Sequence, residues 1–95
     1  MQHPDDQATD AAIEVTIFDL LSRRKDGATI CPSDVARVLV ADGGPWRGLM
    51  PRVRHVAQGL AESGRLRVTR DGVEVDAESR GGPIRLGRPI RQDTD

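Results

Sequence analysis

Apolar and polar residues follow two different periods between Pro51 and Val75, and this stretch predicts the centre of the fold. Residues spaced three or four apart form one apolar helical stripe of Val53, Val56, Ala57, Leu60 and Ala61. Proline is tolerated near the start of a helix, and a glycine just past the last periodic residue can close one. The sequence therefore predicts an amphipathic helix that begins near Pro51 and ends at Gly64.

After Gly64 the period changes to two, which is typical of a β-hairpin. Residues 66–69 and 73–76 each alternate, and Asp71-Gly72 between them suits a two-residue type I′ turn. Counting outward from this turn pairs Arg70 with Val73, Thr69 with Glu74, Val68 with Val75, and Arg67 with Asp76. We therefore expect Leu66, Val68 and Val75 on the buried face, and an Arg67–Asp76 ion pair on the solvent face.

Two further helices are expected in the first half of the chain. The first is capped by Thr9 or Asp10 and runs to about Arg24, and its inner stripe is Ile13, Ile17, Leu20 and Leu21. The second is capped by Ser33, and its inner face is Val35, Ala36, Val38 and Leu39. Residues 28–30 are suited to a third strand of the hairpin's sheet, and residues 84–86 to a last short strand.

The order of these elements predicts the fold class. Helix, short strand, helix, longer helix and hairpin is the order of a winged helix, an α+β fold with a three-helix helix-turn-helix core and a small antiparallel β-hairpin wing. At 95 residues the chain supports one modest core. We expect a disordered N-terminal tail over 1–8, one domain over 9–86 and a loose C-terminal tail over 87–95.

Several short runs also carry a family resemblance. They are residues 29–37, Trp46-Arg47, residues 49–54, Gly64-Arg65 and residues 82–86. These runs resemble those of the bacterial domain-of-unknown-function family 3253, and the resemblance covers about residues 13–86. It implies a winged-helix-like fold. Because the family has no assigned activity, the resemblance implies no functional residue.

Charge is distributed unevenly along the chain. Residues 1–26 contain six acidic and three basic residues, a net −3, whereas residues 47–91 contain ten arginines and five acidic residues, a net +5. Such asymmetry can direct a polyanion to one face of a protein. The alternative is compositional, since thirteen arginines and a single lysine are also typical of GC-rich coding sequence.

If the fold binds duplex DNA, the third helix enters the major groove and the hairpin tip reaches the neighbouring backbone. The exposed candidates for nucleic-acid binding are Arg47, Arg52, His55 and Gln58 on or before the helix, and Arg70 at the wing. Arginine can grip phosphate or read guanine, and glutamine can read adenine. Glu62 and Glu74 would oppose this contact, so a plain solvated surface is the alternative.

Four other features allow two interpretations each. Trp46 is a core or joint residue, or it stacks on bases. The cations at residues 23–25 complement the end of the first helix, or they contact nucleic acid. Val15 and Phe18 are covered within the molecule, or they form a patch for a protein partner. Cys31 precedes a helix N-terminus, where it is an inert thiol or a reactive one.

No pattern in the sequence indicates catalysis. We find no glycine-rich phosphate loop, no assignable nucleophile and base, no metal-ligand spacing and no cofactor motif, so we expect no enzyme and no small-molecule substrate. The absence of a signal peptide and of a long apolar run predicts a cytoplasmic protein that contacts no membrane. The interpretation favoured by the sequence is a nucleic-acid-binding, regulator-like winged helix. The alternative is a protein-interaction module that uses the first helix and binds no DNA.

Overall fold

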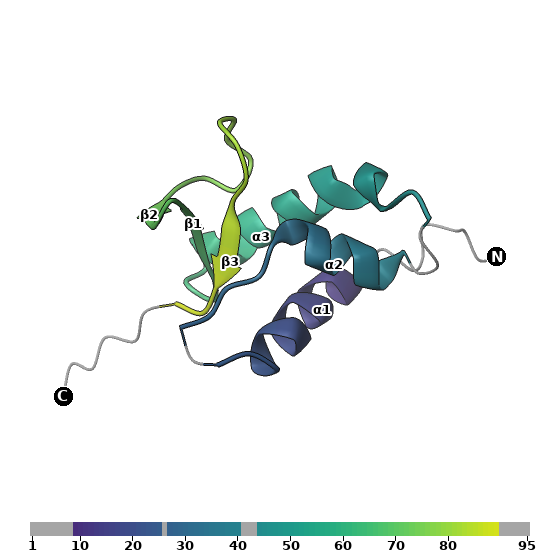
Figure 1. Cartoon of the computed structure of the whole chain (residues 1–95), viewed down its shortest axis with the longest axis horizontal. Coiled ribbons are helices and arrows are strands. Elements are labelled where there is room, and N and C mark those ends of the chain that lie inside the picture. The colour runs from purple at the N-terminus through teal and green to yellow at the C-terminus, as the bar shows by residue number, and fades with distance from the viewer. Residues whose placement is uncertain (1–8, 26, 41–43, 90–95) are drawn as a thin grey trace.

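The computed structural model describes residues 9–25, 27–40 and 44–89 of the chain. Its elements in chain order are α1 (Asp10–Ser22), α2 (Pro32–Leu39), η2 (Trp46–Leu49), α3 (Met50–Glu62), β1 (Arg67–Arg70), β2 (Val73–Glu74) and β3 (Arg85–Gly87) (Figure 1). The described part is therefore α+β, with three α-helices and a small antiparallel sheet. The expected tail over 1–8, and residues 90–95 of the other one, lie outside the described residues.

The first helix begins at a polar capping side chain, and the second begins at a proline, which has no N–H to satisfy. The Thr9 hydroxyl accepts a hydrogen bond from the Ala12 N–H at 3.1 Å, which confirms Thr9 as the cap of α1. The cap of α2 was predicted to be Ser33, and this is wrong. Cys31 is the N-cap and Pro32 the first helical residue, where proline's missing N–H costs no hydrogen bond. The Asp34 carboxylate accepts from the Cys31 N–H at 3.0 Å.

Helix α3 confirms the central prediction from the apolar stripe. Val53, Ala57 and Leu60 are buried, and a short 3₁₀ turn, η2, leads directly into the helix. At its end, Gly64 has a φ of +79°, the Gly64 N–H donates to the Ala61 carbonyl, and the Arg65 N–H donates to the Leu60 carbonyl. This pair of bonds is the Schellman motif, in which a glycine in the left-handed conformation closes the helix.

The hairpin has the predicted register. Arg70 pairs with Val73 and Thr69 with Glu74, and the Val75 N–H donates to the Val68 carbonyl at 3.0 Å. Asp71 and Gly72 have φ values of +54° and +83°, as a type I′ turn requires.

The third strand of the sheet is β3, which pairs antiparallel with the other edge of β1, so the strand order is β2-β1-β3. Gly87 belongs to β3 and pairs with Arg67, so the sheet extends into the range expected as a loose tail. Residues 28–30 do not form a regular strand. Ile30 alone bridges to Leu86 through two backbone hydrogen bonds of 2.8 Å, on the edge of β3 away from β1.

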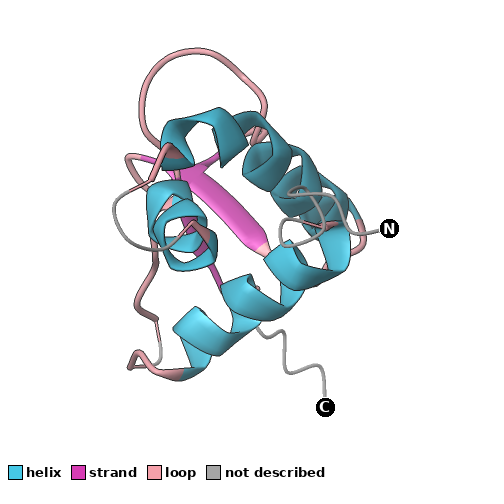
Figure 2. Cartoon of the chain, turned by 90° about the vertical axis from the view of Figure 1, so that its right-hand side faces the viewer, coloured by secondary structure: helices cyan, strands magenta, loops and turns pink. Residues whose placement is uncertain are grey.

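The core lies between the helices and the sheet. The side view of Figure 2 shows the sheet behind the helices. Its members are apolar residues from every α-helix, from β1 and β3, and from the connecting segments. The largest fully buried side chains are Ile13, Ile17, Leu21, Ile30, Leu86, Val35 and Val53. Burial of these aliphatic groups is the main stabilising contribution.

Two apolar side chains of the helices, Val38 and Val15, are exposed. Val38, predicted on the inner face of α2, is 53% exposed, because this short helix turns only Pro32, Val35 and Ala36 fully into the core. Val15 on α1 is 67% exposed. Phe18 is partly buried, and the Arg65 guanidinium carbon lies 5.2 Å from its ring centroid. Within the described ranges, no helix is long and apolar enough to cross a membrane.

Candidate nucleic-acid interface

The outward face of α3 was expected to read DNA, but Arg52, the arginine predicted to do so, is used within the protein. Arg52 Nε forms an ion pair with the Asp10 carboxylate at the start of α1. Both side chains remain more than half exposed. The pair joins the first turns of two helices, so Arg52 stabilises the helical layer and is partly neutralised as a phosphate ligand.

His55 and Gln58, one turn apart on α3, both contact the segment that follows β2. His55 Nδ1 lies 3.4 Å from the Glu78 carboxylate. Gln58 Oε1 accepts from the Ala77 N–H at 2.7 Å, and Gln58 Nε2 donates to Glu62 at 3.1 Å. Ala77 is 1% exposed. The chain from residue 76 to residue 82, which we call the 76–82 segment, therefore lies against the middle of α3, and Gln58 is committed to holding it.

Arg70 was predicted to extend from the wing toward a DNA backbone, and the structure places it differently. Its guanidinium turns back to the 76–82 segment, where it donates to the Ser79 carbonyl and hydroxyl at 3.4 Å and to the Gly82 carbonyl at 3.0 Å. Its Nε is buried and has no hydrogen-bond partner in the described residues. Arg70 therefore shapes a loop instead of projecting from it.

The expected Arg67–Asp76 ion pair is also wrong. Arg67 Nε contacts the Glu74 carboxylate at 3.2 Å. The Asp76 carboxylate instead accepts from the Glu78 N–H at 2.8 Å and begins the turn of the 76–82 segment. The hairpin ladder ends before Asp76, so the opposite-charge contact forms on the diagonal with Glu74.

Arg47 is the one predicted site residue whose side chain makes no ion pair or hydrogen bond in the described part of the chain. Its guanidinium carbon lies 4.5 Å from the centroid of the half-buried Trp46 ring. The guanidinium carbon of Arg37, from the last turn of α2, lies at the same distance from that ring. We call Arg37, Trp46 and Arg47 the Trp46 cluster. It joins the end of α2 to the turn that leads into α3.

The chemistry of this cluster differs from that of an ion pair. A guanidinium over an indole ring is held by the ring's quadrupole, and this contact uses none of its five N–H donors. Both arginine side chains are exposed, so their donors face solvent. The arrangement orients two cations and leaves them available to a phosphate. The ring, with guanidinium groups over it, is poorly placed to stack on a base.

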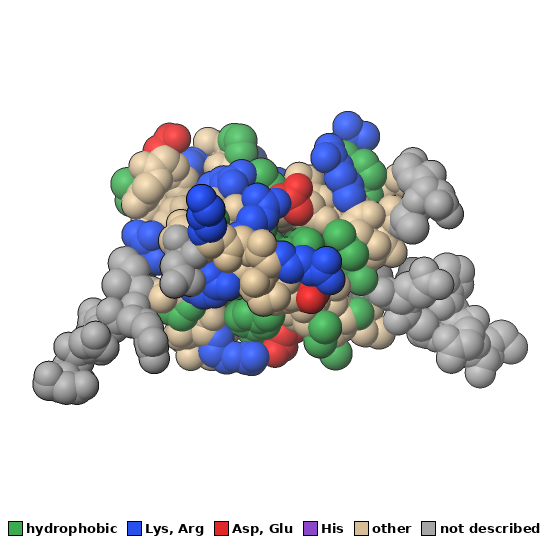
Figure 3. Space-filling view, turned by 60° about the horizontal axis from the view of Figure 1, so that its bottom comes forward, with side chains coloured by type: hydrophobic (Ala, Val, Ile, Leu, Met, Phe, Trp, Pro, Cys, Tyr) green, Lys and Arg blue, Asp and Glu red, His purple; other side chains and the backbone are tan. Residues whose placement is uncertain are grey.

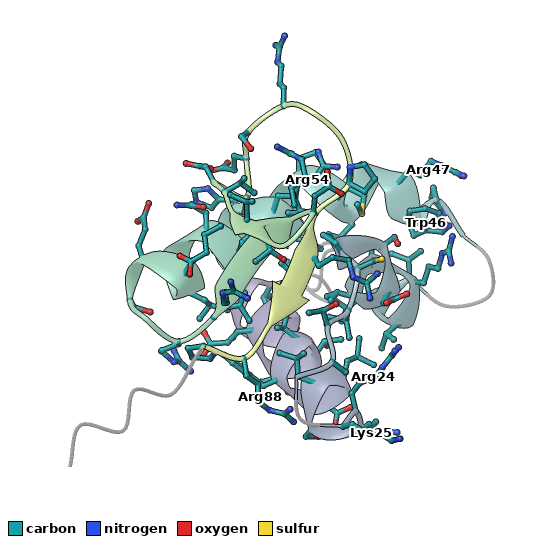
Figure 4. All side chains as sticks on the ribbon, turned by 60° about the vertical axis from the view of Figure 1, so that its left-hand side comes forward. Arg24, Lys25, Trp46, Arg47, Arg54 and Arg88 are labelled. Atoms are coloured by element: carbon teal, nitrogen blue, oxygen red, sulfur yellow. The ribbon has the colours of Figure 1, made fainter. Side chains whose placement is uncertain are left out.

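Figure 4 shows Arg54 near the top of the view, and Trp46 and Arg47 at its right-hand side. Arg54 is half-buried on α3 and has no ion-pair partner among the described residues. Sequence reasoning missed Arg37 and Arg54 as candidates. The outward position of Arg37 on the second helix was a signal, but only the packed structure brings it against Trp46.

Acidic side chains gather on the side of α3 that faces the hairpin, and one of them, Glu74, is paired with Arg67. Two adjoining hollows of about 310 and 320 Å³ lie there and share Ala61, Glu74 and Val75 as lining residues. Glu62 and Asp76 line the second of them. Carboxylates repel phosphate, so a polyanion is disfavoured on this side.

Cys31 is half-buried beside β3. Arg85 Nη1 donates to its sulfur, while Arg85 Nε and Nη2 donate to the hydroxyl and carbonyl oxygens of Thr29 at 2.7 and 3.0 Å. These bonds attach β3 to the segment before α2. Among the described residues, no group of three or more His, Cys, Asp or Glu side chains could hold a metal ion.

The comparisons with known proteins give one family and no function. The model of the family described as "Protein of unknown function (DUF3253)" matches residues 10–89. The match covers most of the chain, as the resemblance in the sequence predicted, and the chain belongs to this family. The search of curated proteins finds no match.

Proposed function

We propose that this member of the DUF3253 family is a winged-helix protein that binds the phosphate backbone of duplex nucleic acid through the Trp46 cluster. One observation carries the proposal. Arg37 and Arg47 are oriented by an aromatic ring, are exposed, and have no acidic partner in the described part of the chain. Arginines in this state are suited to bidentate contact with phosphate.

The order of elements supports the winged-helix assignment. A helix, a one-residue bridge at Ile30, two helices and a small antiparallel sheet follow one another, and the sheet packs behind the helices. In helix-turn-helix proteins the helix that precedes the recognition helix crosses the DNA backbone. The Trp46 cluster lies at the end of α2 and the start of η2, which is the corresponding position.

The contacts of α3 favour backbone binding over base reading. Arg52 is paired with Asp10, Gln58 holds the Ala77 N–H, and His55 lies beside Glu78. Phosphate contacts position a protein on a duplex without reading its sequence. We therefore expect weak, strongly salt-dependent binding with little preference for base sequence.

The test is the salt dependence of binding to a random-sequence duplex. Log affinity falls with log salt by about 0.9 for each phosphate neutralised, so Arg37→Gln/Arg47→Gln should flatten the slope by about 1.8 units. Between about 50 and 200 mM salt, the affinity of this variant should therefore change about 12-fold less than that of the wild type.

The matched control is Arg65→Gln/Arg67→Gln. It removes the same formal charge from two arginines that are already paired with Glu14 and Glu74. The control should leave the slope within about half a unit of wild type. If both double variants flattened the salt slope equally, the effect would come from net charge alone and would contradict a specific role of the Trp46 cluster. No retardation of the duplex at low salt would reject the proposal and favour the protein-interaction alternative, for which exposed Val15 on α1 is the natural starting point.

A further inference from the structure

A second group of cations lies where α1 ends beside β3. We call Arg24, Lys25, Arg85 and Arg88 the α1-end cluster. Arg88 Nη2 donates to the Leu21 carbonyl at 2.6 Å, and Arg85 is bonded to Thr29 and Cys31. These contacts bring the C-terminal end of the sheet against the segment between α1 and α2. Figure 4 shows Arg24, Lys25 and Arg88 along the bottom of the view, and Trp46 and Arg47 at its upper right.

Stabilisation of the helix end does not account for Arg24 and Lys25. Cations near a helix C-terminus interact favourably with its negative pole. Here Arg88 already donates to a terminal carbonyl, and Arg23 is paired with Asp19 at 3.2 Å. Arg24 and Lys25 lie beyond the last helical residue and are exposed, and their side chains have no hydrogen-bond or ion-pair partner in the described ranges.

One residue of each cluster lies at an end of α2. Arg85 contacts Cys31, the N-cap of that helix, and Arg37 is in its last turn. Eight residues at 1.5 Å each make α2 about 12 Å long. Duplex DNA carries one negative charge per about 1.7 Å of its axis, so a single duplex presents several phosphates over this length. Asp34 is the acidic residue of α2, and its carboxylate is hydrogen-bonded to the Cys31 N–H.

We infer that Arg24 and Lys25 of the α1-end cluster form a second phosphate-contact surface, and that one duplex reaches from these two residues along α2 to the Trp46 cluster. The inference rests on the proposed function, because it extends the same binding site. Lys and Arg side chains also predominate over acidic ones on the lower face of the molecule, where α1 and the segment after it come forward (Figure 3). Asp26, which follows Lys25 in the sequence, lies outside the described residues.

The experiment uses the full chain and a random-sequence duplex of about two helical turns. Arg24→Gln/Lys25→Gln should flatten the salt slope by about 1.8 units while the stoichiometry stays at one duplex per chain. Arg23→Gln is the control from the same stretch, and it should leave the slope within about half a unit because this arginine is paired with Asp19. Thermal melting of each variant without DNA shows whether it is folded.

The outcomes separate this inference from the proposed function. Flattening by both Arg24→Gln/Lys25→Gln and Arg37→Gln/Arg47→Gln supports one continuous site. A slope unchanged by Arg24→Gln/Lys25→Gln, with flattening by the Trp46-cluster variant, overturns only the inference. Two duplexes per wild-type chain, reduced to one by Arg24→Gln/Lys25→Gln, also overturns it, because each cluster would then bind its own duplex. Absence of any binding by wild type rejects the proposed function itself.

Discussion

The arginines around the sheet and those around Trp46 are the same side chain in two different situations. In the sheet region, Arg67 is paired with Glu74, Arg70 donates to the 76–82 segment, and Arg85 donates to Thr29 and Cys31. In the Trp46 cluster, the guanidinium groups of Arg37 and Arg47 lie over an aromatic ring, and their side chains make no hydrogen bond within the described residues.

This difference in hydrogen bonding suggests that the two groups of arginines serve different purposes, one stability and the other binding. A guanidinium whose donors bond to protein acceptors connects segments of the fold, and its removal leaves those acceptors unpaired. A guanidinium held over a ring is restrained by the ring, and its N–H donors stay available for other partners. We therefore expect substitutions in the sheet region to lower stability, and those in the Trp46 cluster to lower affinity for phosphate at nearly constant stability.

The largest effect on stability is expected for Arg70→Ala. The substitution removes three hydrogen bonds to the 76–82 segment and should lower the free energy of unfolding by about 2 kcal/mol, since bonds from charged donors are among the stronger ones. Urea denaturation would measure it. Arg80→Ala is the control, because Arg80 is exposed on the same segment and has no ion-pair partner among the described residues. Equal losses in the two variants would contradict the structural role of Arg70.

The next largest effect is expected for Gln58→Ala. This substitution should lower the free energy of unfolding by about 1.5 kcal/mol, because it leaves the buried Ala77 N–H without its acceptor. Hydrogen exchange at Ala77 should also accelerate. Glu62→Ala is the matched change, as it removes the other hydrogen bond of Gln58 and leaves the Ala77 contact intact. Unchanged exchange in Gln58→Ala would mean that the 76–82 segment is held by other contacts.

Gly64→Ala is a reference for these stability changes, because it involves no arginine. Gly64 has a φ of +79°, and a Cβ there would meet no other atom within 4 Å. The cost is therefore conformational alone and should be about 1 kcal/mol, read as a lower melting temperature. A melting temperature equal to that of wild type would remove the capping role from this residue.

The smallest effect on stability is expected for Arg47→Gln. Loss of one exposed cation–π contact should lower the free energy of unfolding by about 0.5 kcal/mol or less, although the same variant should flatten the salt slope of DNA binding by about 0.9 units. Paired urea and DNA-titration measurements on one preparation would show both. If this variant destabilised the protein as much as Arg70→Ala, the contrast between the two regions would disappear.

The candidate site was predictable only in part. Arg47 was named from the sequence because it lies beside a tryptophan before the third helix, and it remains a candidate. Arg52, His55 and Gln58 were named because they face outward on that helix, which helical periodicity does predict. Periodicity does not predict that Asp10 or the 76–82 segment meets them, since those contacts join residues far apart in the chain.

The sequence alone determined the helices, their caps to within two residues, the hairpin register and the aliphatic core, because these depend on neighbours a few positions apart. Only the tertiary structure decided that β3 is the third strand, that Arg70 folds inward, and that Arg37 shares a ring with Arg47. Each of those outcomes depends on which distant acceptor or ring lies within reach of a long side chain or a short strand. Packing of the whole chain decides this, and no local pattern records it.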